Sequence, residues 1–146
     1  MKLSIFMGTY NRAELLERSL ECYARSTLSP GHFELIIMDD WSADGTEDLI
    51  KYWACHLNII YMRPFYKEPG LWCDSSSFLN RAINSATGDL VIGTHPEVMP
   101  GKTTLEEMAA LPRSGNYVAA KPYYLSPSQQ ELIDTVDWKG KGVDAI

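Results

Sequence analysis

Short apolar runs alternate with stretches of helical periodicity along the first two thirds of the chain. Runs at 3–7, 35–38, 58–62 and 90–93 predict four strands. The run at 35–38 is apolar without interruption, which is typical of a strand buried on both faces by helices. Between the strands, apolar residues recur at the spacing of one helix face. This order predicts a doubly wound α/β sheet in a single domain.

The helical segments carry two patterns that a structure can check. Asn11 and Glu14, three positions apart, match the reciprocal cap of a helix start. A later helix is predicted over 74–86, and its apolar residues share one predicted face: Phe78, Leu79, Ala82, Ile83 and Ala86. Weaker signals predict a short helix after Thr103 or Thr104, a strand at 117–120 and a helix at 127–136.

The length, the net charge and the apolar runs of the chain argue against several classes of protein. The 146 residues suffice for one domain with a proper core, and 45% of them are hydrophobic. The net charge of -6 gives no basic footprint, so nucleic acid and anionic membrane surfaces are not expected partners. No apolar run approaches the length of a membrane span. The short apolar start is predicted to be the first strand and not a signal peptide.

Cysteine usage indicates a reducing compartment. Cys22, Cys55 and Cys73 are odd in number and widely spaced, so we expect a cytoplasmic protein without disulfides. Cys22 and Cys55 fall in helical patterns, where a cysteine is usually a small buried hydrophobe. Metal ligation through Cys55 and His56 is the alternative.

Polar residues follow the first two strands at the point where each one ends. Thr9 and Tyr10 follow the first strand, and Asp39 and Asp40 follow the second. Ligands of open parallel sheets bind outside the carboxyl ends of the strands, so these four residues are predicted to lie together beside a crevice.

Three motifs in this order resemble those of a known family. They are Gly-Thr-Tyr-Asn-Arg at 8–12, Ile-Ile-Met-Asp-Asp-Trp-Ser-Ala-Asp-Gly-Thr at 36–46 and Leu-Asn-Arg-Ala-Ile-Asn-Ser-Ala-Thr-Gly-Asp at 79–89. The chain resembles the nucleotide-binding half of an inverting family-2 glycosyltransferase of the GT-A fold. The resemblance implies a three-layer sandwich around a mostly parallel sheet. It places nucleotide-sugar binding in 1–100 and a reduced acceptor side in 101–146.

The resemblance also assigns roles to the residues at the strand ends. Gly8, Thr9 and Tyr10 are expected to line the nucleotide base and ribose, and Tyr10 could stack on the base. Asp40 corresponds to the aspartate that accepts the uracil N–H, a bond that the carboxylate charge strengthens. A turn or helix-capping pair is the other interpretation of Asp39 and Asp40.

At the metal motif the chain departs from the family. Such enzymes carry Asp-x-Asp after the fourth strand, whereas this chain has His95-Pro96-Glu97. Proline favours an extended residue before it, so His95 and Glu97 are predicted to project to the same side. Imidazole with carboxylate favours Mn²⁺ over Mg²⁺, which prefers oxygen ligands. In the alternative, His95 donates to phosphate and no metal is used.

The sequence also offers candidates for contacts to the diphosphate and for the catalytic base. Lys67 and Arg81 are candidates to assist at the diphosphate, although Arg81 also fits a solvated helix charge. Asp134 and Asp137 are weak candidates for the general base that deprotonates the hydroxyl of a saccharide or other acceptor. The expected function is transfer from a nucleotide-diphosphate sugar, most simply a UDP-sugar. A binding domain without transfer activity and a nucleotidyltransferase are the alternatives, and a second copy or a partner domain could complete the site.

Overall fold

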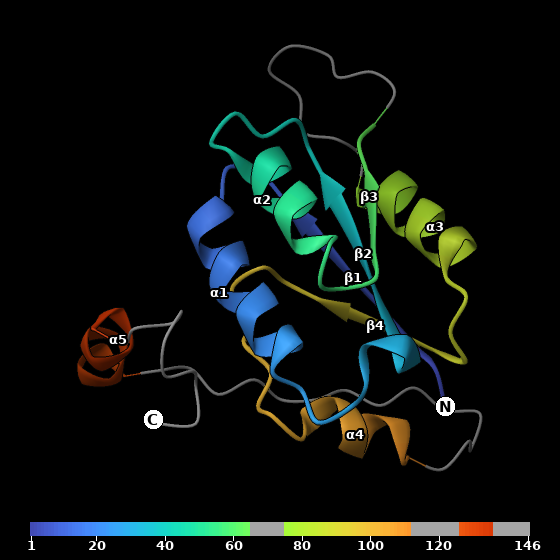
Figure 1. The fold of residues 1–146 in the computed structure, drawn as a ribbon. Coiled ribbons are helices and arrows are strands. Elements are labelled where there is room, and N and C mark those ends of the chain that lie inside the picture. The colour runs from blue at the N-terminus through green and yellow to red at the C-terminus, as the bar shows by residue number, and fades with distance from the viewer. Residues whose placement is uncertain (65–74, 112–125, 136–146) are drawn as a thin grey trace.

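The fold is built on four parallel strands (Figure 1). The structure is a computed structural model that describes residues 1–64, 75–111 and 126–135. The strands are β1 (Leu3–Thr9), β2 (Phe33–Asp39), β3 (Ile59–Met62) and β4 (Leu90–Thr94). They pair in the order β3-β2-β1-β4, and every pairing is parallel. All four strands predicted from the sequence are present, with boundaries shifted by two residues at most.

Three of the described helices connect the strands and flank the sheet, and two more follow the last strand. Their bounds are α1 (Ala13–Ala24), α2 (Thr46–Trp53), α3 (Ser75–Ser85), α4 (Thr104–Ala109) and α5 (Pro127–Asp134), with a 3₁₀ turn η1 at Pro30–His32. Figure 1 shows α1 and α2 over one face of the sheet and α3 over the other. The predicted three-layer α/β arrangement is therefore confirmed. Within the described residues, no helix combines the length and the apolarity needed to cross a membrane.

Two apolar clusters fill the spaces between these layers. The larger one joins α1, α2 and α4 to alternating strand residues, which include Leu3, Ile5, Met7, Phe33, Leu35 and Ile37. The smaller one joins Ile36 and Met38 of β2 to Phe78 and Ala82 of α3. All seven residues of β2 are buried, as predicted for a strand covered on both faces.

The predicted apolar face of α3 is broader than the one that the helix buries. Phe78 and Ala82, four residues apart, are the pair that lies against the sheet. Leu79 and Ile83 are 38% and 47% exposed, so only part of the predicted apolar face is buried. Each lies about 100° further round the helix than its buried neighbour, on the flank of the contact.

Two local predictions were wrong. The N-cap of α1 is Arg12, without a side-chain capping bond, and the Asn11 side chain instead accepts a hydrogen bond from the Ala43 amide. Cys22 is buried as predicted, but Cys55 is exposed. Cys55 lies beyond the end of α2, where the chain has already left the helix face that packs on the sheet. The strand predicted at 117–120 lies outside the described residues.

The buried carboxylate of Glu34 holds the α3–β4 connection against the amino ends of β1 and β2. Glu34 is 2% exposed and accepts hydrogen bonds from Ser4 Oγ at 2.6 Å and the Thr87 amide at 2.7 Å. Thr87 Oγ1 also donates to it, and Lys2 Nζ lies 3.0 Å away. Burial alone would raise the pKa of Glu34, but these donors outweigh it and lower the pKa to about 2.

Candidate functional site

The loops that follow β1 and β2 are joined at the carboxyl end of the sheet. Thr9 pairs with Asp39 at the last register position, and the Asp40 amide donates to the Thr9 carbonyl at 2.9 Å. Further along, the Asn11 amide donates to Ser42 Oγ at 2.8 Å. The structure therefore brings the polar ends of the two strands side by side, as predicted from the parallel topology.

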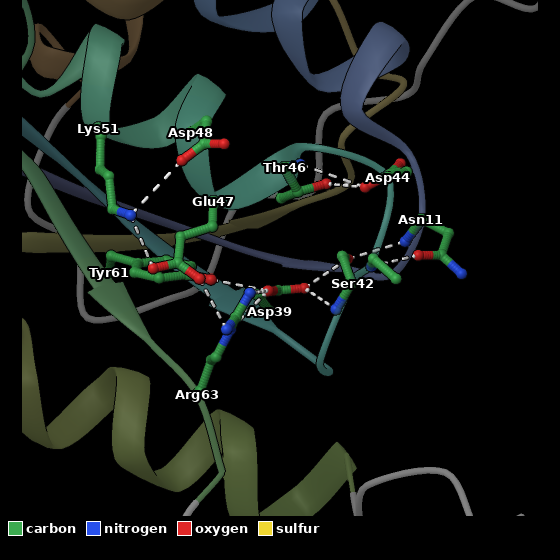
Figure 2. A network of polar contacts seen from close by, with 11 residues as sticks. Asn11, Asp39, Ser42, Asp44, Thr46, Glu47, Asp48, Lys51, Tyr61 and Arg63 are labelled. Carbon is green, nitrogen blue, oxygen red and sulfur yellow. Dashed lines mark hydrogen bonds and ion pairs between the residues drawn. The ribbon is translucent and has the colours of Figure 1, made fainter.

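The two aspartates at the end of β2 have different surroundings, and Figure 2 shows those of Asp39. Asp39 is 0% exposed and accepts from the Ser42 amide at 2.9 Å, Tyr61 Oη at 2.7 Å and Arg63 Nε at 2.9 Å. The bond from the Ser42 amide fits the turn interpretation of Asp39, and the bonds from Tyr61 and Arg63 join the ends of β2 and β3. Burial and the hydrogen bond to Asp39 raise the pKa of Tyr61, which keeps its hydroxyl a donor.

Asp40 lies beside the residues that end β1. It is 7% exposed, and Thr9 is 5% exposed. The buried Thr9 Oγ1 makes no hydrogen bond within the part of the chain that the structure describes. Tyr10 is half-buried and Gly8 is exposed, with open space where a Cβ would point. Carboxylate, hydroxyl and aromatic groups therefore meet at one edge, a combination suited to a polar ring such as a nucleobase.

Arg63, directly after β3, contacts two carboxylates and two aromatic rings next to this edge. Its guanidinium pairs with Asp39 and, at 2.8 Å, with Glu47 Oε2. The same group lies 5.3 Å from the ring centroid of Trp41 and 5.5 Å from that of Tyr61. Sequence reasoning missed Arg63 and Glu47 because neither lies within the three motifs. An arginine directly after the third strand was the available signal.

The segment after β4 does not continue extended as predicted. The Val98 amide donates to the His95 carbonyl at 3.1 Å, which closes a turn over Pro96 and Glu97. The alternation argument for His95 and Glu97 was therefore wrong, because it requires an extended chain. Both residues are exposed.

Glu97 is held by a cation from the β1–α1 loop. Arg12 Nη1 lies 2.8 Å from Glu97 Oε2, with about half of each side chain exposed. Partial burial would raise the pKa of Glu97, but the hydrogen bond from Arg12 and the nearby charges, including that of His95, lower it overall. Among the described residues, no group of three or more His, Cys, Asp or Glu side chains could hold a metal ion. A metal at His95 and Glu97 would need ligand oxygens from a bound molecule.

Of the other predicted site residues, Arg81 is the one whose side chain the structure describes. Arg81 is half-buried in α3, and its Nη1 donates to the Arg63 carbonyl at 3.1 Å, so it supports the end of β3. Asp134 is the last residue of α5, and the description of the structure does not extend to its side chain. Lys67 and Asp137 lie outside the described residues. Their roles stay predictions.

Known proteins share both the sequence pattern and the fold. Validoxylamine A glucosyltransferase of Streptomyces hygroscopicus subsp. limoneus is 42% identical over 60 residues, which are 41% of this chain and 13% of that protein. The uncharacterized glycosyltransferase MG060 homolog of Mycoplasma pneumoniae is 28% identical over 120 residues, which are 80% of this chain and 38% of that protein.

A solved structure of TarS from S. aureus, in complex with UDP, gives a TM-score of 0.65 at 26% identity. The match covers 75% of this chain and 31% of the TarS chain. The likeness confirms the predicted GT-A-like fold. The chain spans less than two fifths of the length of each of these relatives. The sequence profile of glycosyl transferase family 2 matches residues 4–131, so the chain belongs to this family.

Proposed function

We propose that the protein binds a UDP-sugar at the carboxyl ends of β1 and β2 and transfers the sugar, with inversion, to a hydroxyl acceptor. The observation that carries the proposal is the buried Asp40 beside Thr9 and Tyr10, at the edge where parallel sheets bind ligands. The TarS chain, which shares this fold at 25–26% identity, has been solved with UDP and with UDP-GlcNAc.

The chemistry of the site fits a uracil ring. Uracil presents an N–H between two carbonyls, and the Asp40 carboxylate can accept that N–H in a charge-assisted hydrogen bond. Thr9 Oγ1 needs a partner on burial, and a ribose hydroxyl or a base carbonyl could supply it. Tyr10 offers a ring on which the base could stack, and Gly8 leaves the adjacent backbone open to the ligand.

His95 and Glu97 are the proposed metal-binding pair, with Mn²⁺ favoured over Mg²⁺. Glu97 has a lowered pKa and is ionised at neutral pH, so it can serve as a ligand beside the imidazole. Diphosphate oxygens would complete the coordination, because the described residues supply too few ligands alone. A divalent ion held there would neutralise charge on the leaving nucleoside diphosphate. Lys67 and Arg81 are proposed to assist at the same group.

Inversion requires a base that takes the proton of the attacking hydroxyl as the bond between the sugar and the diphosphate breaks. Asp134 and Asp137 remain the proposed candidates within this chain. We place the acceptor side in 101–146 and expect a second copy or a partner domain to complete it.

A second candidate function is nucleotide-sugar binding without transfer. It is favoured by the length comparison, because the chain spans 38% of the MG060 homolog and 31% of the TarS chain. Under this proposal the donor site is intact and the catalytic base belongs to a part that this chain does not contain.

Calorimetric titration of UDP, first with Mn²⁺ and then with a chelator, tests the donor site. Binding that requires Mn²⁺ would support the His95 and Glu97 pair, and metal-independent binding would reduce the pair to direct phosphate contacts. CDP in place of UDP should bind at least about tenfold more weakly, because cytosine N3 is an acceptor and offers Asp40 no ring N–H. Release of UDP from UDP-sugars that depends on an added saccharide would then separate transfer from binding. Absence of UDP binding under all conditions would refute the proposal.

A further inference from the structure

A large aromatic residue occupies an unusual backbone conformation directly after Asp40. Trp41 has φ +62°, in the left-handed region that glycine and asparagine adopt more readily than bulky residues. The residue is 44% exposed and belongs to neither of the two apolar clusters. Strain of this kind persists where surrounding structure imposes it, and it concentrates at binding and catalytic sites. Core packing therefore does not account for tryptophan at this position.

Trp41 lies on the paired loops of the proposed donor site. The bond from the Asp40 amide to the Thr9 carbonyl precedes it, and the bond from the Asn11 amide to Ser42 Oγ follows it. Between these two bonds lie Trp41 on one loop and Tyr10 on the other. Both aromatic residues consequently belong to the edge where the proposed nucleotide would bind.

The position of the Trp41 ring is fixed from one side by a cation. The Arg63 guanidinium carbon lies 5.3 Å from the ring centroid, within the range of an attractive cation–π contact. Arg63 is itself held by Asp39 at 2.9 Å and by Glu47 at 2.8 Å. The indole is thus ordered before any ligand arrives, which lowers the entropy that binding must spend.

We infer that Trp41 is a nucleobase-contacting residue of the donor site, whose indole ring packs against the uracil while Asp40 accepts its N–H. The inference rests on the proposed function and names a residue that the predicted contacts did not include. Stacking on an aromatic ring favours every base. Trp41 therefore supplies affinity, whereas Asp40 supplies the preference for a base that carries a ring N–H, as uracil does.

Titration of UDP and of uridine into Trp41→Asn and Trp41→Tyr tests this role. Asparagine tolerates the left-handed backbone, so Trp41→Asn should keep or raise the Tm of the protein. The same variant should bind UDP and uridine about tenfold more weakly than the unmodified chain, since both carry the base. Trp41→Tyr retains a ring and should keep most of the affinity. Tyr52→Ala, at a residue of α2 that is 61% exposed, is the control and should change neither affinity.

Three results would overturn the inference. The first is unchanged affinity of Trp41→Asn for both ligands. The second is weaker binding of UDP with unchanged binding of uridine, which would place the contact at the diphosphate. The third is a fall in Tm together with equal loss of binding in Trp41→Asn and Trp41→Tyr, which would make Trp41 structural. Failure of the unmodified protein to bind either ligand would refute the proposed function itself, and this inference with it.

Discussion

Replacing Glu34 by glutamine tests the buried carboxylate that joins the α3–β4 connection to the sheet. The pKa of Glu34 falls from 4.5 to about 2 in the folded protein. Each pKa unit corresponds to about 1.4 kcal/mol, so the ionised group stabilises the fold by about 3 kcal/mol relative to its protonated form. Glutamine retains one acceptor oxygen but loses the charge that Lys2 faces at 3.0 Å. We expect Glu34→Gln to lower the free energy of unfolding by about 2–3 kcal/mol at pH 7.

The pH dependence of this effect has a definite sign. The folded pKa of Glu34 lies below the unfolded one, so the stabilisation is fully present above pH 4.5 and is lost as the pH falls towards 2. The stability difference between the unmodified chain and Glu34→Gln should therefore shrink across this interval. Glutamine does not titrate, so its own contribution stays constant.

Urea denaturation of both proteins at pH 7 and at several values down to pH 3 provides the measurement. Glu14→Gln is the matched control, because Glu14 pairs with Arg18 while its side chain is 79% exposed. That change should cost less than about 1 kcal/mol at any pH. Equal stability of Glu34→Gln and the unmodified chain at pH 7, or a difference that does not shrink in acid, would refute the reasoning.

Three further predictions follow from buried groups. Asp39→Ala removes the carboxylate that accepts hydrogen bonds from Ser42, Tyr61 and Arg63, and it should lower the free energy of unfolding by about 3 kcal/mol in urea denaturation. A loss below about 1 kcal/mol would contradict the stabilising role of this buried network. Gly88→Ala places a Cβ 2.7 Å from the Ser4 amide nitrogen and should cost about 1–3 kcal/mol in the same assay, whereas an unchanged stability would contradict the close approach. Iodoacetamide should label the exposed Cys55 in the native protein and spare Cys22, because burial raises the pKa of the Cys22 thiol to about 12. Peptide mass spectrometry measures the labelling of both cysteines, and equal labelling would contradict this prediction.

The sheet could be predicted from the sequence because its signal is strong. An uninterrupted apolar run such as 35–38 allows few structures other than a strand covered on both faces, and the parallel order follows from the alternation with helices. That order then fixes which strand ends meet. The approach of Thr9 to Asp40 was therefore predictable without any knowledge of side-chain contacts.

The local details could not be predicted because tertiary contacts decide them. Asn11 and Glu14 match a helix cap, yet Asn11 bonds to the Ala43 amide of a loop that is distant in sequence. Likewise, the turn after His95 depends on a hydrogen bond to Val98, which a rule for the residue before proline does not include.

Arg63 and Trp41 were missed for a similar reason. Their contact joins the end of β3 to the loop after β2. Arg63 lies outside the three motifs, and the motif that contains Trp41 does not indicate this contact. The left-handed backbone of Trp41 has no sequence signal either, because tryptophan is not a residue that favours it.

Calorimetric titration of UDP into the unmodified protein and into Asp40→Asn tests the central claim most directly. Asparagine has nearly the same shape as aspartate but no charge, so the fold should be retained while the charge-assisted bond to the uracil N–H is weakened. We predict that UDP binds to the unmodified protein and that its affinity falls by about tenfold or more in Asp40→Asn. Equal affinities for UDP in the two proteins would contradict the assignment of Asp40 to the nucleobase, and no binding to either would contradict the donor site as a whole.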